Sequence, residues 1–188
     1  QKQEMTRQTL QLLGERRQFS GYAEIGSKGR YWRGLAGALK FKGQKIFIDE
    51  RPQSFSPPDI MERGQLARLG TQLPLDDYAP LPEAIADQSL DFVGCYVGLH
   101  HMTVDRLAPF LASIRRVLRP GGVFIVREHD VRDENVRALV SLAHTVFNAG
   151  LAETWETNAR ELRLFEPIAT WVKRLDEAGF DDSTHRIL

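Results

Sequence analysis

The sequence predicts an α/β fold with a doubly wound, mostly parallel sheet and helices on both faces. The main observation is the segment 89–130, in which two apolar, strand-like runs flank one amphipathic helix, and Arg119-Pro120-Gly121-Gly122 separates that helix from the second run. Because this order is a β-α-β unit, it implies parallel strands. The second observation is that strand and helix patterns alternate along the rest of the chain, as they do in doubly wound sheets.

The first half of the chain supplies further elements of this kind. Residues 5–18 are predicted to form a polar helix, and residues 22–25 a short buried strand followed by a turn over 26–30. Residues 31–39 form a helix because apolar residues recur there at helical spacing. Residues 45–49 are a second apolar strand, three prolines make 50–58 a loop, and residues 59–69 form a helix. Residues 73–78 are a short strand whose pairing Pro74 limits, and residues 79–88 are a loop.

The second half begins with the β-α-β unit, whose helix turns six apolar side chains to one face: Leu107, Phe110, Leu111, Ile114, Val117 and Leu118. Asp133 can cap the next helix, whose apolar face is Val136, Leu139, Val140, Ala143 and Phe147. Residues 148–163 have weak periodicity and are either a lid over a substrate or an ordinary surface crossover. The last helix begins near Pro167 and ends at Gly179, and residues 180–188 are predicted to add a strand.

Length, charge and cysteine content limit the class of protein. A chain of 188 residues fits one domain: an N-terminal helix over 1–20, a core over 21–130, and C-terminal helices with a last strand over 131–188. Its 25 basic and 25 acidic residues balance, so neither nucleic acid nor a membrane is expected as a partner. Cys95 is the only cysteine, which predicts a buried thiol and a reducing, cytoplasmic compartment. No apolar run approaches the ~20 residues that span a bilayer.

Three motifs of the β-α-β unit resemble those of a known family. Leu90-Asp91-Phe92-Val93, Leu99-His100-His101 and the segment 116–122 are similar to the second half of class I S-adenosylmethionine-dependent methyltransferases. Their co-occurrence over about 40 residues is specific, although each motif alone is weak. The resemblance covers residues 21–180. It implies a Rossmann-like sheet of seven strands, S-adenosylmethionine as cofactor, and a small-molecule substrate.

The ends of the sequence predict a piece of something longer. The chain starts with polar residues and no initiator Met, and it stops at Ile187-Leu188 within the predicted last strand. About six of the seven strands that the family has are accounted for. We therefore expect the family's final antiparallel strand to lie beyond Leu188, so that the sheet lacks it by truncation.

The resemblance also implies a cofactor-binding turn after the first strand, formed by Glu24, Gly26, Ser27 and Gly29. In this interpretation the carboxylate of Glu24 holds the ammonium group of the cofactor, and helix N-terminal amides face its carboxylate. The turn departs from the family pattern, because Lys28 and Arg30 hold the places of the second and third glycines. Without the resemblance, the same residues predict an ordinary strand-to-helix turn with a solvated glutamate.

Further cofactor contacts are implied at the ends of the next strands. Asp49 would accept hydrogen bonds from both ribose hydroxyls, because a carboxylate has two oxygens with spare lone pairs. The resemblance places Asp76, Asp77 and Tyr78 near the adenine, and Tyr96 and Gly98 beside the methionine part of the cofactor. The plainer interpretation of these acids is surface charge at a strand end or in a turn.

Histidines follow both strands of the β-α-β unit, and they are the candidate catalytic residues: His100, His101 and His129. Because parallel strands end at one edge of a sheet, these imidazoles are predicted to border a substrate whose hydroxyl they could orient or deprotonate. The plainer interpretation is that they cap a helix or pack. They could also converge with Asp130 on a metal, but the spacing matches no ligand signature, so no metal site is predicted.

Two other functions stay open. The reduced glycine content of the first turn is compatible with a non-catalytic binding or regulatory module on the same fold. A nicotinamide-dependent oxidoreductase also needs a glycine-rich turn, but residues 26–29 fit that pattern worse. Methyl transfer requires mainly placement of an activated donor, so the absence of a catalytic triad does not count against it.

Overall fold

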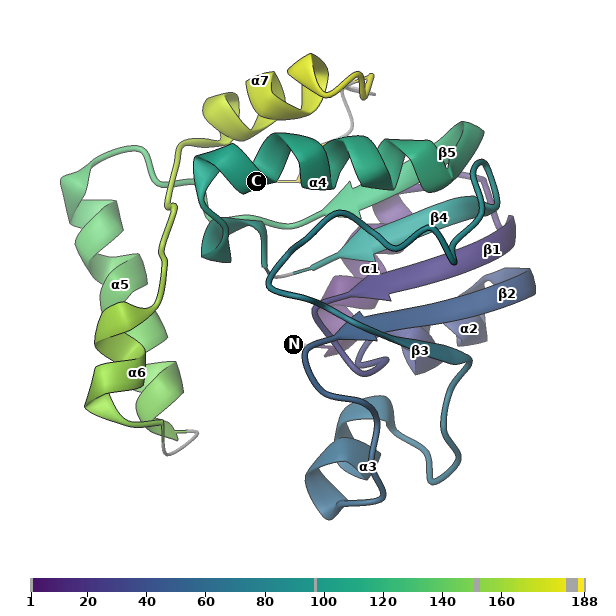
Figure 1. The fold of residues 1–188 in the computed structure, drawn as a ribbon, viewed down its shortest axis with the longest axis horizontal. Helices are drawn as coiled ribbons and strands as arrows, with labels where there is room; N and C mark the ends of the chain where they lie inside the picture. Colours follow the sequence, from purple (N-terminus) through teal and green to yellow (C-terminus); the bar gives the residue numbers. More distant parts are fainter. Residues whose placement is uncertain (1, 97, 151–152, 182–185, 188) are drawn as a thin grey trace.

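The computed structural model describes residues 2–96, 98–150, 153–181 and 186–187, and it confirms the predicted α/β fold (Figure 1). The strands that it describes form one parallel sheet in the order β3-β2-β1-β4-β5. Their bounds are β1 (Gln18–Ile25), β2 (Lys40–Asp49), β3 (Thr71–Pro74), β4 (Leu90–Cys95) and β5 (Leu118–Val126). The strand order reverses between β1 and β4, so the switch point of the sheet lies there.

The helices follow the predicted order. They are α1 (Lys2–Leu12), α2 (Trp32–Ala38), α3 (Pro57–Arg63), the short 3-10 helix η1 (Leu99–His101), α4 (Val104–Val117), α5 (Glu134–Gly150), α6 (Trp155–Arg160) and α7 (Ile168–Glu177). Within the described ranges, none of these helices combines the length and the apolar character that crossing a bilayer requires.

Alternation along the strands builds a separate apolar layer on each face of the sheet. On one face, Tyr22 of β1 packs in a cluster with Met5 of α1 and Leu35 of α2. On the other face, Ile25 of β1 belongs to a cluster with Phe110 of α4 and Trp171 of α7. Figure 1 shows the same arrangement, with α4 and α7 on one side of the sheet and α1 and α2 on the other. Both faces of the sheet are therefore covered, as the doubly wound prediction requires.

The Arg119-Pro120-Gly121-Gly122 motif was predicted to separate the helix from the strand, and that detail is wrong. β5 already begins at Leu118, which pairs with Leu90, and the pairing then jumps to Val123 opposite Phe92. The motif therefore forms a bulge inside β5, in which the extra residues leave the ladder without ending the strand.

The predicted face of α5 does not reach the core. Leu139 and Phe147 are 66% and 57% exposed, and Asn148 is the one residue of α5 that is buried. α5 and α6 lie beside one another, away from the sheet (Figure 1); we call them the α5–α6 arm. The helices of the arm expose apolar side chains to solvent, and they do not form a layer over the sheet.

The strand predicted over 180–188 is only partly testable. Residues 180, 181, 186 and 187 are not in a strand, and the other residues of that prediction lie outside the described part of the chain.

Candidate functional site

The turn after β1 is built around the carboxylate of Glu24, which has no exposed surface. The hydroxyl of Tyr22 donates to Glu24 Oε2 at 2.6 Å, the backbone N–H of Tyr31 donates to Oε1 at 3.2 Å, and the hydroxyl of Ser27 also donates to Oε1. Burial raises the pKa of Glu24, against the hydrogen bonds that lower it. Both carboxylate oxygens are thus engaged within the chain, and Glu24 fixes the turn from inside.

Ser27 and Gly29 shape the same turn. The Ser27 oxygen accepts hydrogen bonds from the backbone N–H of Gly29 at 3.3 Å and of Arg30 at 3.2 Å. Gly29 has a φ of +90°, and a Cβ there would lie 2.4 Å from Cδ1 of Leu69. A glycine is therefore required at 29, one place earlier than in the family pattern. Gly26 is exposed, with its N–H bonded to Ile48 O at 2.8 Å.

Lys28, which replaces the family's second glycine, is held across the turn by a carboxylate. Its Nζ lies 2.9 Å from Oδ1 of Asp59 in α3, and both side chains are nearly buried. Burial alone would raise the pKa of Asp59, but hydrogen bonds from Lys28 and Ser54 outweigh it and lower the pKa to about 2. The amide of Gln53 also donates to Lys28 O at 3.0 Å. These contacts therefore hold the segment after β2 against the turn that follows β1.

Asp49 is the last residue of β2, at the same edge of the sheet as the turn after β1. Its Oδ1 accepts from the Arg51 N–H at 3.1 Å, and its side chain is half-buried, so acceptor capacity is left for a ligand.

The Asp76–Tyr78 segment lies further along the same edge. Asp76 and Asp77 are exposed, and Asp77 pairs with Arg106 of α4. The ring of Tyr78 packs edge-on against Phe110, and burial raises the pKa of its hydroxyl.

Gly98 and Tyr96 follow β4 but point to different places. Gly98 has a φ of +153°, and a Cβ there would lie 3.0 Å from the Tyr78 hydroxyl, so these two predicted residues meet. Tyr96 is buried on the α1 face, where its ring packs on Tyr31 and its hydroxyl accepts from Thr9 Oγ1 at 3.3 Å. Tyr96 therefore supports the back of the β1 turn.

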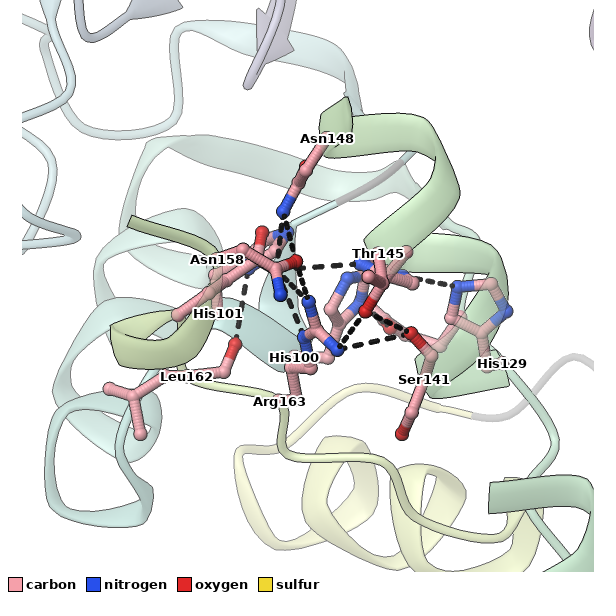
Figure 2. A network of polar contacts seen from close by, with 12 residues as sticks. His100, His101, His129, Ser141, Thr145, Asn148, Asn158, Leu162 and Arg163 are labelled. Carbon is pink, nitrogen blue, oxygen red and sulfur yellow. Dashed lines mark hydrogen bonds and ion pairs between the residues drawn. The ribbon is translucent and has the colours of Figure 1, made fainter. Parts of the chain in front are cut away.

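The structure brings His100, His101 and His129 together (Figure 2). His144 from α5 joins them, with its ring against that of His100. We call these four residues the histidine cluster. His100 is buried, and its Nδ1 lies 2.5 Å from Oε2 of Glu128. The other oxygen of Glu128 accepts from the Leu99 N–H at 2.9 Å. A carboxylate at the end of β5 therefore orients the first histidine after β4.

The remaining members of the cluster have partners from α5 and the segment that follows α6. Nδ1 of His101 lies 3.2 Å from Leu162 O, and Nε2 of His129 lies 3.1 Å from Nε2 of His144. Burial, followed by the repulsion that a protonated His100 would exert, lowers the pKa of His101, of His129 and of His144, the last to about 4. These three imidazoles are therefore neutral at pH 7, the form in which a ring nitrogen accepts a proton or a metal ion.

Asp130, the other residue considered for a metal, is not in the cluster. Its carboxylate accepts from the Ile168 N–H at 2.9 Å and from Arg132, so it caps α7. His144 and Arg63 were not predicted. A signal for His144 was present, because Ser141, His144, Thr145 and Asn148 form a polar stripe at helical spacing.

A cavity lies beside the sheet, mostly away from these strand ends. It has a volume of about 910 Å³ and runs along β5, between α1 and α7. Leu99 and Glu128 are among its lining residues, so one end of the cavity reaches the region next to His100.

Comparisons with known proteins agree with this geometry. Residues 62–126, from within α3 to the end of β5, match the model of a methyltransferase domain. The chain has the fold of class I methyltransferases. Its five-stranded parallel sheet, with the switch point between β1 and β4, is the part of the chain that carries this fold. No curated protein sequence matches this chain.

Three solved structures illustrate the similarity. Phosphoethanolamine N-methyltransferase 2 of Haemonchus contortus, in complex with S-adenosyl-L-methionine, has a TM-score of 0.61 and 15% identity over 95% of this chain and 37% of its own. For 1,6-didemethyltoxoflavin-N1-methyltransferase of Burkholderia thailandensis the TM-score is 0.59 and the identity 15%, over 95% of this chain and 67% of that protein's chain. For a methyltransferase from Methanococcus maripaludis the TM-score is 0.56 and the identity 16%, over 96% of this chain and 77% of that protein's chain. The chain thus spans little more than a third of the first of these proteins.

Proposed function

We propose that this methyltransferase domain transfers the methyl group of S-adenosylmethionine to a small-molecule acceptor. The observation that carries the proposal is the methyltransferase match over 62–126, in a sheet whose switch point places the β1 turn beside Gly98. Open parallel sheets bind ligands at this point, outside the carboxyl ends of the strands.

In this proposal every predicted cofactor residue receives a role, although Glu24 and Tyr96 act without touching the cofactor. The carboxylate of Asp49 accepts the ribose hydroxyls, and the Asp76–Tyr78 segment closes over the adenine side. The turn of Gly26, Ser27 and Gly29 approaches the methionine part. Glu24 acts through that turn, because its oxygens are occupied by Tyr22, Ser27 and Tyr31. Glu24 is therefore a positioning residue, and Tyr96 supports it from behind.

The cofactor supplies an already activated methyl group when it is bound. The chain then has to hold the acceptor in line with that group and keep water out, which supplies most of the acceleration in such displacements. The histidine cluster lies at the ends of β4 and β5, next to the cofactor side, and it borders the acceptor.

A small-molecule acceptor fits two observations. The balanced charge offers no field for a nucleic acid backbone, and two of the similar structures are named for small-molecule methylation. Cys95 has no exposed surface, and burial raises its pKa, which supports an unreactive thiol and a cytoplasmic location.

One observation favours a second candidate, a binding module without activity. Lys28 stands in the place of a family glycine and is ion-paired with Asp59 over the turn. If this pair blocks the approach of the cofactor, the domain binds no S-adenosylmethionine, and Lys28→Gly restores binding.

Calorimetric titration with S-adenosylmethionine, S-adenosylhomocysteine and NAD, each added separately, tests the proposal. We expect both sulfur nucleosides to bind and NAD to give no heat. Asp49→Ala should weaken binding by at least ~10-fold, since it removes two hydrogen bonds to a charged group. Glu15→Ala, which removes an exposed acid at the opposite end of β1, should bind like the unaltered chain. Absence of S-adenosylmethionine binding to the unaltered chain would overturn the proposal. Recovery of that binding in Lys28→Gly would establish the second candidate, the binding module without activity.

A further inference from the structure

Four of the chain's five histidines gather at one place, although they come from three separate segments. His100 and His101 form η1 after β4, His129 follows β5, and His144 lies in α5. The ring centre of His100 lies 4.2, 5.3 and 5.1 Å from those of His101, His129 and His144. One ligating nitrogen from each of His100, His101 and His144 lies within 4.8 Å of the others. This assembly is a set of metal-ligand atoms within reach of one ion.

The strongest indication of an occupant is the unpaired nitrogen of His100. Nδ1 of this ring faces Glu128 at 2.5 Å, so the carboxylate fixes the proton on Nδ1 and leaves a lone pair on Nε2. Nε2 is buried and has no hydrogen-bond partner in the described structure. A carboxylate–histidine pair of this kind is the usual outer-shell arrangement behind a metal-bound imidazole.

The second histidine repeats that arrangement, and His129 supports His144. Nδ1 of His101 faces the carbonyl oxygen of Leu162 at 3.2 Å, which leaves its Nε2 free to coordinate. The Nε2 atoms of His129 and His144 are 3.1 Å apart. His129 is therefore a hydrogen-bond partner of His144 and stands outside the set of three ligands.

We propose that His100, His101 and His144 of the histidine cluster bind one divalent transition-metal ion of the zinc type, with Glu128 and Glu161 as outer-shell carboxylates. Imidazole nitrogens select zinc and its neighbours in the first transition row over magnesium and calcium, which prefer oxygen ligands. The two carboxylates lie close enough to offset the charge of the ion: Glu128 touches His100, and an oxygen of Glu161 is 3.6 Å from Nδ1 of His101. As metal ligands, these histidines cannot serve as the proton acceptors predicted from the sequence.

The position of the ion explains what it does for the fold. The α5–α6 arm has almost no apolar packing. The side chain of Asn148 donates hydrogen bonds to Asn158 and Glu161, and the backbone oxygen of Ser141 accepts one from Arg163 (Figure 2). Nδ1 of His144 lies 3.9 Å from an oxygen of Glu161. An ion held by His144 and by the histidines of η1 fastens the arm to the carboxyl edge of the sheet. A metal commonly stabilises segments that lack an apolar core of their own.

The test uses the whole chain, purified without a polyhistidine tag and stripped with a chelator. Zinc is titrated by calorimetry, cobalt is added in parallel to give the visible spectrum of a tetrahedral site, and bound metal is counted by mass spectrometry. We expect one zinc ion per chain, a higher melting temperature with zinc, and a cobalt spectrum. His144→Gln should weaken zinc binding by more than ~100-fold, and Glu128→Gln by about 10–100-fold, the effect of removing an outer-shell partner.

His185→Gln is the matched control, since it removes the one histidine of the sequence that is not among the four of the cluster. Zinc binding equal to that of the unaltered chain is expected for it. Failure of the unaltered chain to bind zinc or cobalt overturns the proposal, as does equal loss in His185→Gln and His144→Gln. The first of these outcomes is measured on the unaltered chain, so it stands even if a variant does not fold. The titrations contain no S-adenosylmethionine, so their result does not depend on methyl transfer.

Discussion

Gly29→Ala tests whether the atypical turn after β1 is shaped by packing. The backbone at Gly29 has a φ of +90°, and an added Cβ would lie 2.4 Å from Cδ1 of Leu69 and 3.1 Å from Cε1 of Phe47. A left-handed conformation costs a residue with a side chain about 1–2 kcal/mol, and overpacking costs a further ~1–3 kcal/mol. We expect the free energy of unfolding to fall by about 3 kcal/mol, which lowers the melting temperature of a chain of this size by roughly 6–12 °C.

Urea denaturation followed by circular dichroism measures the effect. Gly37→Ala is the matched control, because Gly37 lies in α2 with no atom within 4 Å of an added Cβ. That substitution should be neutral or stabilising by up to ~1 kcal/mol. The double variant Gly29→Ala/Leu69→Ala should regain the part of the unfolding free energy that is lost to overpacking. The part that is lost to backbone strain should remain. If Gly29→Ala and Gly37→Ala differ by less than about 0.5 kcal/mol, the packing argument fails.

Two further predictions concern the segment that is fastened onto the turn. Arg63 is fully buried and donates to the carbonyl oxygens of Ser54, Leu66 and Ala67, so Arg63→Met should destabilise the chain by about 3 kcal/mol in urea unfolding; a change below 1 kcal/mol would contradict this. The lowered pKa of Asp59 makes its ion pair stabilising above pH ~4, with that stability lost as the pH falls toward about 2. The unaltered chain should therefore lose about 1 kcal/mol more over this range than Asp59→Asn, after allowance for solvent screening. Parallel pH curves for the two proteins would show that the pair contributes nothing.

The β-α-β unit could be predicted because its local signals agree with the tertiary structure. The apolar face of α4, with Leu107, Phe110 and Ile114, is buried as its spacing requires. Local patterns do not reveal pairing partners, which explains the misplaced boundaries. β2 begins at Lys40 and not at Lys45, because the polar residues from Lys40 onward pair with Gln18–Ser20 of β1. The apolar residues of α5 face outward for the same reason: the pattern defines a helix face but not what that face meets.

The candidate site was predictable at the level of topology and not at the level of side chains. Strand order places the ends of β1, β2, β4 and β5 at one edge, so the residues after them had to be neighbours. Whether Glu24 faces a ligand depends on Tyr22 and Ser27, which engage both of its oxygens only in the folded chain. His144 lies 43 to 44 positions after His101 and His100, on a helix whose apolar pattern favours burial of the opposite side.

The two halves of the site are therefore stabilised in different ways. The turn after β1 is continuous with the apolar layer of α1 and α2, since Tyr31 packs there and its N–H donates to Glu24. Changes at this turn are transmitted to the stability of the whole sheet. The histidine cluster is instead shared between the sheet edge and the α5–α6 arm, whose inward contacts are polar. Polar contacts contribute little net stability unless each partner is satisfied. The bare Nε2 of His100 is the unsatisfied group at the centre of these contacts, so whatever ligand satisfies it controls how firmly the arm is attached.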